Sequence, residues 1–360
     1  MKILHTSDLH LKIDSPERWQ ALDTIVDKAK ENAVDILVIC GDLFDTKEDA
    51  SKSYEKLRKI FSDAHFKTLI LPGNHDETFY EEGLYLGDNV TIINQENNIF
   101  EFNDVKILAI PFNKEYSSNR ATVELLNELN NQTSHTKPNI LLFHGELVTL
   151  TCQPDDFGEG EKARYMPVEL NTFKSLNFQY ILAGHFHTRF NILRIPKNDS
   201  TYFIYPGSPV STTKKERGKR KVNLLEVGKE PMELEIDTFY YEEIEVRLGL
   251  FDEEHPLEKF LKMLSDKAIS ENCSPIFNVT GFFNGTVHAI TEVELKSKLE
   301  EVAKGINGKS NVEFLAKDLG RISNDPLFKK IVTKIKEMDE PNIDEKYKTQ
   351  LMEIFVEAMM

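Results

Sequence analysis

The stretch LILPGNHDE, residues 69–77, begins as a short apolar run and stops at a proline and a glycine. An amide, an imidazole and a carboxylate follow at once, from Asn74, His75 and Asp76. A short apolar run bounded by turn residues is typical of a buried strand. Such side chains bind metals or move protons, so their position directly behind a strand predicts a functional site at the edge of a sheet.

Four further segments repeat this pattern, with acidic or imidazole side chains close to the end of an expected strand. They are SDLH (7–10), CGDLFD (40–45), LLFHG (141–145) and AGHFHT (183–188). Half of the ten histidines fall within these motifs, whereas random placement would scatter them. Loops from several strands converge at the carboxyl edge of an α/β sheet, so we expect the candidate ligands to meet there. These ligands are Asp8, His10, Asp42, Asn74, His144, His185 and His187.

Carboxylate, amide and imidazole donors form a mixed set that suits Mn²⁺, Fe²⁺ or Zn²⁺ better than Mg²⁺. The set contains no cysteine, which disfavours a structural tetrahedral zinc site. It is also too large for one ion, so we expect two divalent ions about 3.5 to 4 Å apart, bridged by one carboxylate. Such a pair lowers the pKa of a bound water and clamps phosphate oxygens, and of the candidate metals we favour Mn²⁺.

Each motif has a structural alternative when it is taken alone. Asp42 or Asp45 could cap the helix that follows, and GNHD could form a turn. One histidine of GHFH could simply be exposed on an edge strand. The order of the motifs and their shared position behind strands favour a metal site over these alternatives.

The composition is that of an ordinary globular protein, with 40% hydrophobic and 29% charged residues in a chain of 360. This length predicts two domains and a small third element. Apolar runs stay well below the roughly 18 residues of a membrane span, and the N-terminus shows no apolar targeting core. Three cysteines, an odd number, indicate a reducing compartment. We therefore expect a cytoplasmic protein without membrane contact.

Apolar runs alternate with amphipathic helices through the first two thirds of the chain, and antiparallel strands follow. This order predicts a central α/β sandwich over residues 1–236. The expected strands are 2–7, 35–40, 68–72, 90–94, 99–102, 105–110, 139–144, 180–185, 189–195, 201–205 and 221–227. The expected helices are 16–32, 47–64, 120–129 and 167–176.

A second unit is expected over residues 237–320, and a helical hairpin over 321–360. The second unit should contain strands at 239–248 and around 276–290, and helices at 256–268 and 292–305. Each helix of the hairpin carries an apolar stripe. The stripes are Phe328, Ile331, Val332, Ile335 and Met338, and Tyr347, Leu351, Ile354, Phe355 and Met359.

The ordered series DLH, GDLFD, GNHD, HG and GHFH resembles the calcineurin-like metallophosphoesterase superfamily, over residues 5 to about 190. YPGSPVS (205–211), followed by KVNLLEV (221–227), resembles the SbcD-type nucleases of DNA double-strand-break repair and recombination. Their eukaryotic and archaeal relatives are the meiotic-recombination-eleven proteins. The resemblance implies a four-layer α/β/β/α sandwich, a smaller α+β capping domain that helps to position DNA, and a nucleoid-associated location.

The same resemblance implies a role for each motif residue. One metal would be held by Asp8, His10, Asp42 and His187. The other would be held by Asn74, His144 and His185, with Asp42 as the bridge.

Three further residues take their expected roles from the same family. His75 would stabilise the transition state and protonate the leaving oxygen, while Asp76 would orient the His75 ring and raise its pKa. Relatives often carry histidine at the position of Asp45, so we interpret this aspartate as a structural group or as a support for a ligand.

The segment TKKERGKR (213–220), with Lys221 after it, concentrates cations in a chain whose formal net charge is −16. An acidic chain is repelled by phosphate backbones, so DNA binding would require such a local cluster. The alternative is a solvated hairpin loop. The candidate substrate contacts are Arg189, Lys214, Lys215 and Arg217.

The two helical stripes either pack back on the capping domain or form a docking surface. The resemblance implies the second, with an SbcC-type, SMC-like ABC ATPase as the partner, and it also implies a homodimer. The expected function is a metal-dependent 3′–5′ exonuclease and endonuclease that acts on DNA with this ATPase. The alternative is a small-molecule or cyclic-nucleotide phosphodiesterase of the same superfamily.

Overall fold

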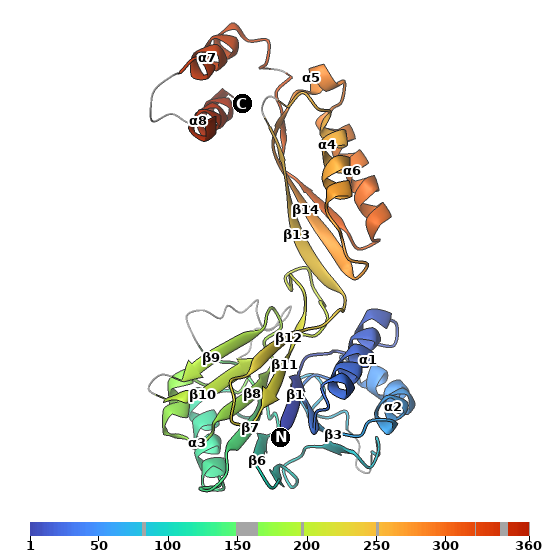
Figure 1. The fold of residues 1–360 in the computed structure, drawn as a ribbon, viewed down its shortest axis with the longest axis vertical. Coiled ribbons are helices and arrows are strands. Elements are labelled where there is room, and N and C mark those ends of the chain that lie inside the picture. Colours follow the sequence, from blue (N-terminus) through green and yellow to red (C-terminus); the bar gives the residue numbers. More distant parts are fainter. Residues whose placement is uncertain are drawn as a thin grey trace. The chain divides into compact units, whose positions relative to one another are not determined.

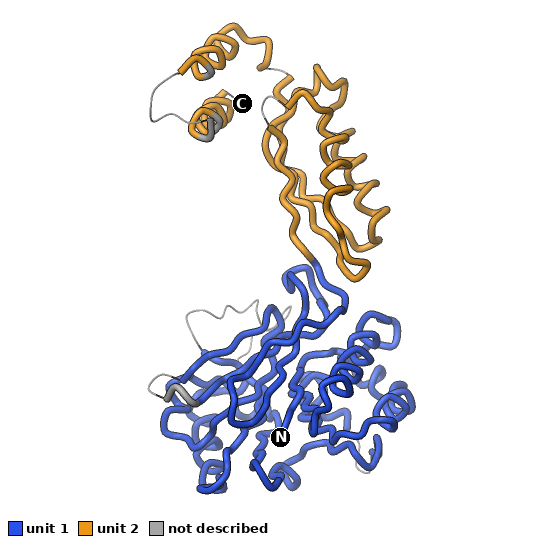
Figure 2. The backbone as a smooth tube through the Cα atoms, viewed as in Figure 1, with its two compact units in different colours: residues 1–241 blue, residues 242–360 orange. Residues whose placement is uncertain are grey.

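The computed structural model describes seven stretches of the chain. They are residues 1–80, 84–148, 165–195, 198–249, 252–320, 322–338 and 345–359. The chain forms two compact units, residues 1–241 and 242–360 (Figure 2).

The first unit contains two six-stranded sheets, ordered β12-β11-β1-β2-β3-β4 and β5-β6-β7-β8-β10-β9. The first consists of β1 (Lys2–Thr6), β2 (Ile36–Cys40), β3 (Lys67–Leu71), β4 (Val90–Ile92), β11 (Lys221–Glu226) and β12 (Met232–Glu235). The second consists of β5 (Ile99–Glu101), β6 (Lys106–Ile110), β7 (Asn139–His144), β8 (Tyr180–Gly184), β9 (Asn191–Ile195) and β10 (Asn198–Tyr205). Strands β1 to β4 run parallel, as do β6, β7, β8 and β10, so their carboxyl ends share an edge within each sheet.

Helices cover the outer face of each sheet (Figure 1). Helices α1 (Pro16–Glu31) and α2 (Lys47–Ser62) pack on the first sheet, and α3 (Asn119–Asn130) and the 3-10 helix η2 (Leu170–Ser175) pack on the second. The two sheets share an inner core. This arrangement confirms the predicted four-layer α/β/β/α sandwich.

Strand β2 shows why its sequence is almost continuously apolar. Successive side chains of a strand point to opposite faces, and both faces of β2 are buried. Leu37 and Ile39 pack among the helices, whereas Ile36 and Val38 pack against the other sheet.

Thr46 caps helix α2 through its side-chain oxygen, which accepts a hydrogen bond from the backbone N–H of Asp49 at 3.2 Å. Neither Asp42 nor Asp45 is therefore the cap of this helix. The structural alternative considered for the GDLFD motif is wrong, and both carboxylates are left for other contacts.

The second unit is a four-stranded sheet with two helices on one face. Its strands are β13 (Tyr240–Leu248), which begins two residues before the boundary, β14 (Cys273–Phe283), β15 (Asn311–Phe314) and β16 (Lys317–Asp318). The covering helices are α4 (Pro256–Asp266) and α6 (Glu292–Ile306). Phe260 and Leu295 pack on Phe277 and Val279 in the core between them.

Two expected elements differ from the prediction. The strand expected to continue to 290 stops at Phe283, because the side chain of Asn284 caps the short helix α5 (Gly285–His288). The helix expected at 167–176 is the 3-10 helix η2.

The C-terminal hairpin consists of α7 (Pro326–Lys336) and α8 (Glu345–Met359). Phe328 and Val356 pack with Phe282 and Leu319 of the same unit, so part of each stripe is buried. On α8 the fully buried positions are Met352 and Val356, whereas the predicted stripe members Tyr347 and Ile354 are exposed. No helix within the described ranges is long and apolar enough to cross a membrane.

Candidate metal centre

Five parallel strands carry the predicted ligands, at their carboxyl ends or in the loops that follow. The loop after β1 carries Asp8 and His10, and it lies against the loop after β2. The backbone N–H of Asp8 donates to the carbonyl of Gly41 at 3.0 Å, and that of His10 donates to the carbonyl of Asp42 at 2.9 Å. These bonds extend the pairing of β1 and β2 beyond the strands, and thereby bring the two motifs together.

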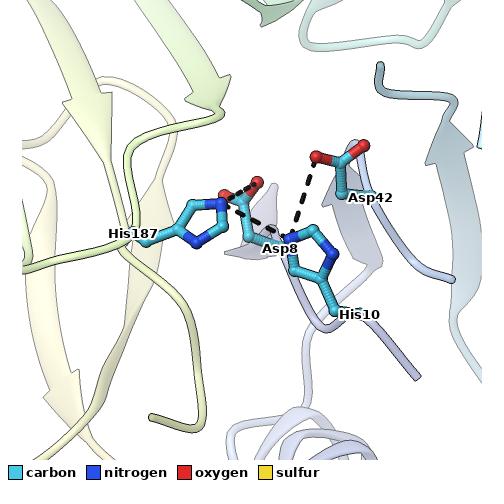
Figure 3. A group of neighbouring side chains, drawn as sticks. All are labelled: Asp8, His10, Asp42 and His187. Carbon is cyan, nitrogen blue, oxygen red and sulfur yellow. Dashed lines mark hydrogen bonds and ion pairs between the residues drawn. The ribbon is translucent and has the colours of Figure 1, made fainter. Parts of the chain in front are cut away.

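The first donor group consists of Asp8, His10, Asp42 and His187, whose ligand atoms all lie within 4.8 Å of one another (Figure 3). Nε2 of His187 is 3.4 Å from Nε2 of His10 and 3.5 Å from Oδ1 of Asp8. Nε2 of His10 is 3.9 Å from Oδ2 of Asp42. All four residues are buried, although they come from three loops far apart in sequence.

The second donor group consists of Asp42, His144 and His185, again within 4.8 Å of one another. Nε2 of His144 lies 3.4 Å from Oδ2 of Asp42 and 2.8 Å from the side-chain oxygen of Asn74. Asp42 thus belongs to both groups. The structure brings all seven predicted ligands together and places the expected bridging carboxylate between the two sets.

The carboxylate of Asp42 provides a test of whether this cluster fits metal ions. Its Oδ1 accepts a hydrogen bond from the backbone N–H of His75 at 2.9 Å. Its Oδ2 is buried, and no hydrogen bond reaches it from the described residues. A buried oxygen without a donor is costly, and Oδ2 faces imidazole nitrogens of both groups. The donor set therefore fits divalent cations, which Asp42 and the imidazoles of both groups would hold.

Three of the imidazoles turn the ring nitrogen that faces away from the cluster toward an oxygen atom, and for His144 this contact is a hydrogen bond. Nδ1 of His144 is 2.9 Å from the carbonyl of Cys40. Nδ1 of His10 is 3.5 Å from Asp45, and Nδ1 of His187 is 3.6 Å from Glu216. A proton on each Nδ1 leaves the lone pair of Nε2 directed toward the centre, which is the usual arrangement of metal-binding histidines.

Asp45 supports His10 and is itself fixed by two cations. Its carboxylate lies 2.9 Å from Nζ of Lys12 and 3.6 Å from the guanidinium of Arg18. Burial would raise the pKa of Asp45, but its contacts with His10 and Lys12 lower it. Asp45 also forms a third ligand-like group with His10 and His75. The two cations already offset its charge, so this third group is a poor candidate for a metal.

Four of the seven predicted ligands adopt a left-handed backbone conformation. The φ angles are 55° at Asp8, 46° at His10, 50° at Asp42 and 96° at His185. Such conformations are uncommon for residues other than glycine, and they concentrate at functional sites where the surrounding structure imposes them.

The pKa values show how strongly the donors interact. Burial would raise the pKa of Asp8, but the charge of His187 lowers it to about 2. Burial would lower the pKa of His144, but the carboxylate of Asp42 raises it to about 9. Carboxylate and imidazolium therefore neutralise each other here, and a divalent ion would take the place of the protons.

His75 and Asp76 lie in different surroundings, although they are adjacent in sequence. His75 is exposed, with its ring centroid 4.8 Å from that of His10, so it stands at the rim of the first donor group. Asp76 is buried, and burial raises its pKa to about 6.

The hydrogen bonds to Asp76 come from the backbone N–H groups of Gly73 at 2.8 Å, Leu43 at 2.8 Å and Phe44 at 3.2 Å. The hydroxyl of Tyr80 donates as well, at 2.8 Å. These contacts tie the loop after β3 to the loop after β2. These contacts give Asp76 a part in joining the two loops, and its expected role in orienting His75 stays a prediction.

The cations in and near the basic run differ in their contacts and burial. The predicted substrate contacts Arg189, Lys214, Lys215 and Arg217 are all exposed. Lys219 and Lys221 of the same run form ion pairs with Glu235 at 2.6 Å and Glu233 at 2.8 Å. Arg220 is buried. The local positive charge is therefore smaller than the sequence indicates.

Sequence reasoning missed Glu216, which is buried against His187. The sequence offers one signal for this residue, because Glu216 is the only acidic residue in the run 213–221.

The YPGSP segment forms hydrogen bonds with the segments that follow β7 and β8, close to the predicted ligands. The hydroxyl of Tyr205 donates to the carbonyl of Gly145 at 2.6 Å and accepts from the N–H of Leu147 at 3.0 Å. The N–H of Ser208 donates to the carbonyl of His187 at 3.0 Å. The segment thus fixes the loops after β7 and β8.

A sequence profile described as calcineurin-like phosphoesterase matches residues 1–189, a range that includes all seven candidate ligands. Among solved structures, the chain is similar to TT1561 of Thermus thermophilus, with 17% identity and a TM-score of 0.40, covering 61% of this chain and 92% of that one. It is similar to a dimetal phosphatase from Danio rerio, with 8% identity and a TM-score of 0.46, covering 66% and 96%. It is also similar to GAP50, the anchor in the inner membrane complex of Plasmodium, with 12% identity and a TM-score of 0.41, covering 72% and 94%.

Proposed function

The chain belongs to the calcineurin-like phosphoesterase family, and from this premise we propose that it is a metal-dependent DNA nuclease. The family and the two donor groups support a metal-dependent phosphoester hydrolase. The finer proposal is a 3′–5′ exonuclease and endonuclease of double-strand-break repair. The observation that carries the hydrolytic chemistry is Asp42, whose carboxylate belongs to both donor groups.

In this proposal each donor group holds one metal ion, and Asn74 is a further ligand of the second group. Two divalent ions, with Mn²⁺ as the best match to the donors, would supply Lewis acidity and a water of lowered pKa. His75 stands at the rim and is exposed, so it is available to protonate the leaving oxygen. The bond from its backbone N–H to Asp42 fixes its position relative to the centre.

DNA as the substrate is supported by the YPGSPVS and KVNLLEV segments and by four exposed cations in the first unit. These cations are Arg189, Lys214, Lys215 and Arg217. The second unit adds surface that a small substrate does not need. We further propose that α7 and α8 dock an SbcC-type ATPase through exposed apolar residues, which include Leu327, Tyr347 and Ile354, and that the chain forms a homodimer.

A second candidate is a small-molecule or cyclic-nucleotide phosphodiesterase. The observation in its favour is electrostatic. The chain carries a formal net charge of −16, and glutamates neutralise Lys219 and Lys221 of the basic run. A small phosphodiester depends less than duplex DNA on an extended basic surface.

The test is hydrolysis by the purified full-length protein with Mn²⁺, using linear duplex DNA and bis-p-nitrophenyl phosphate in parallel. An Asp8→Ala variant prepared identically detects contaminating nucleases. We expect wild type to cleave both substrates and the variant to cleave neither. Cleavage of the small ester alone, with and without the ATPase partner, would favour the second candidate. Cleavage of neither substrate would contradict both.

A further inference from the structure

Residues 211–220 form a segment that we name the His187 strap. It joins the end of the YPGSP motif to β11, and it contains most of the basic run. The N–H of Ser211 donates to the carbonyl of Phe239 at 3.0 Å, and the N–H of Gly218 donates to the carbonyl of Tyr241 at 2.7 Å. Two separate backbone bonds therefore anchor the strap to the end of the first unit.

Arg220 fixes the main chain around His187 from the end of the strap. Its side chain is 3% exposed. The guanidinium donates to the carbonyls of His187 at 2.6 Å, Ser208 at 2.8 Å and Thr188 at 3.0 Å. A buried guanidinium that satisfies three carbonyls contributes to structure and is withdrawn from any contact with substrate.

Glu216 reaches the same histidine from the middle of the strap. Its side chain is 1% exposed, which is costly for a carboxylate unless it is well paired. Thr212 donates to it twice, through the backbone N–H at 2.7 Å and the hydroxyl at 2.6 Å. The Oε1 atom of Glu216 also lies 3.6 Å from Nδ1 of His187.

We propose that Glu216 is a positioning residue for the first donor group. The negative charge of its carboxylate, 3.6 Å from Nδ1 of His187, favours a proton on that nitrogen, which leaves the lone pair of Nε2 directed toward Asp8 and His10 (Figure 3). The inference rests on the proposed function only in treating this group as a metal site. It is independent of whether the substrate is DNA.

The structure predicts that the loss of Glu216 affects the two donor groups unequally. Glu216 contacts an imidazole of the first group, whereas His144 of the second group is held by the backbone carbonyl of Cys40. Loss of the Glu216 carboxylate should therefore weaken one of the two metal sites and leave the other nearly unchanged.

The experiment is calorimetric titration of the metal-free, full-length protein with Mn²⁺, without substrate. Wild type should bind two ions. Glu216→Ala should lose about 10- to 100-fold in affinity at one site, the range typical of groups that orient metal-binding histidines. Glu216→Gln keeps an acceptor oxygen and should lose less at that same site. If Glu216→Ala does not fold, as judged by circular dichroism, Glu216→Gln decides the question.

Glu233→Gln is the matched control, because it removes one carboxylate beside the strap, from the ion pair with Lys221. This variant should bind both ions as wild type does. The proposal is overturned if the Glu216 variants bind both ions with wild-type affinity, or if both sites weaken equally. If wild type itself binds fewer than two ions, the two-metal basis of the proposed function fails instead.

Discussion

The buried carboxylate of Asp42 faces imidazoles on two sides, whereas His75, held to it by a backbone hydrogen bond, is exposed. In the function we propose, metal binding and proton transfer thus belong to different side chains in one small region. Asp42 and its neighbours have the burial and close spacing that metal ligands need. His75 has the access to solvent and substrate that a proton donor needs.

His75→Ala should therefore separate cleavage from metal binding. We expect phosphodiester cleavage to fall by roughly 10²- to 10⁴-fold, because general-acid catalysis contributes about this much. Mn²⁺ stoichiometry, measured by elemental analysis, and DNA binding should stay at wild-type values. His65→Ala, which changes an exposed histidine outside the motifs, is the control. Loss of one metal ion from His75→Ala would instead make His75 a ligand.

His5 predicts a specific pH dependence of stability. Burial lowers its pKa from 6.5 to about 3, so the folded protein keeps this imidazole neutral. Between these values the unfolded chain takes up a proton that the folded protein does not, and stability falls as the pH falls. In urea unfolding of the metal-free protein, wild type should lose about 1.4 kcal/mol more than His5→Gln between about pH 5.5 and 4.5. Parallel pH profiles for the two proteins would contradict this.

The clustering of the candidate ligands was predictable because residue type and position behind a strand are both visible in a sequence. The roles of Asp76 and Glu216 were not, because they depend on contacts that sequence distance hides. Asp76 is adjacent to His75, yet its carboxylate accepts hydrogen bonds from backbone N–H groups in the loops after β3 and β2. Glu216 lies 29 residues after His187, within a basic run that favoured a solvated loop.

The turns that follow the parallel strands bring the motifs into contact, and Gly41 makes one of the closest approaches possible. Gly41, between β2 and Asp42, has a φ of 91°. A Cβ atom at this position would lie 1.8 Å from Nδ1 of His144. The carbonyl of Cys40, which immediately precedes this glycine, is the group that orients His144.

Gly41→Ala should accordingly be among the most damaging small substitutions in the first unit. We expect a loss of about 3 kcal/mol or more in unfolding free energy, from backbone strain and from displacement of His144. Gly228→Ala is the matched control, because Gly228 has a φ of 93° but no atom within 4 Å of the added Cβ. Its cost should be about 1 to 2 kcal/mol. Equal losses for the two variants in urea unfolding would contradict the close-contact explanation.

Periodicity predicted the elements of the first unit well because both faces of β2 and its neighbours are buried, which gives long unbroken apolar runs. It failed where a local contact decides the structure. The side chain of Asn284 ends β14 early. On α8, Met352 and Val356 are buried, and Val356 packs with Phe282 and Leu319 of the same unit, so the buried face lies away from Tyr347 and Ile354.

The boundary between the two compact units follows Tyr241, whereas the sequence predicted it between residues 236 and 237. Residues 239–241 belong with the first unit because Phe239 and Tyr241 accept backbone bonds from the His187 strap. Their side chains are also buried.

A fragment of residues 1–241 should therefore be more stable than a fragment of residues 1–236. We expect a difference of about 2 kcal/mol or more in urea unfolding, because the shorter fragment loses buried aromatic area and two anchors of the strap. The shorter fragment should also bind Mn²⁺ more weakly at one site. Equal stability of the two fragments would show that the strap does not need these anchors.

Anomalous diffraction from crystals of the full-length protein grown with Mn²⁺ tests the shared-carboxylate centre directly. We predict two manganese peaks about 3.5 to 4 Å apart. One should lie among Asp8, His10 and His187, the other beside His144 and His185, and both should contact Asp42. A single peak, or two peaks of which only one contacts Asp42, would contradict a two-metal phosphoesterase centre in this protein.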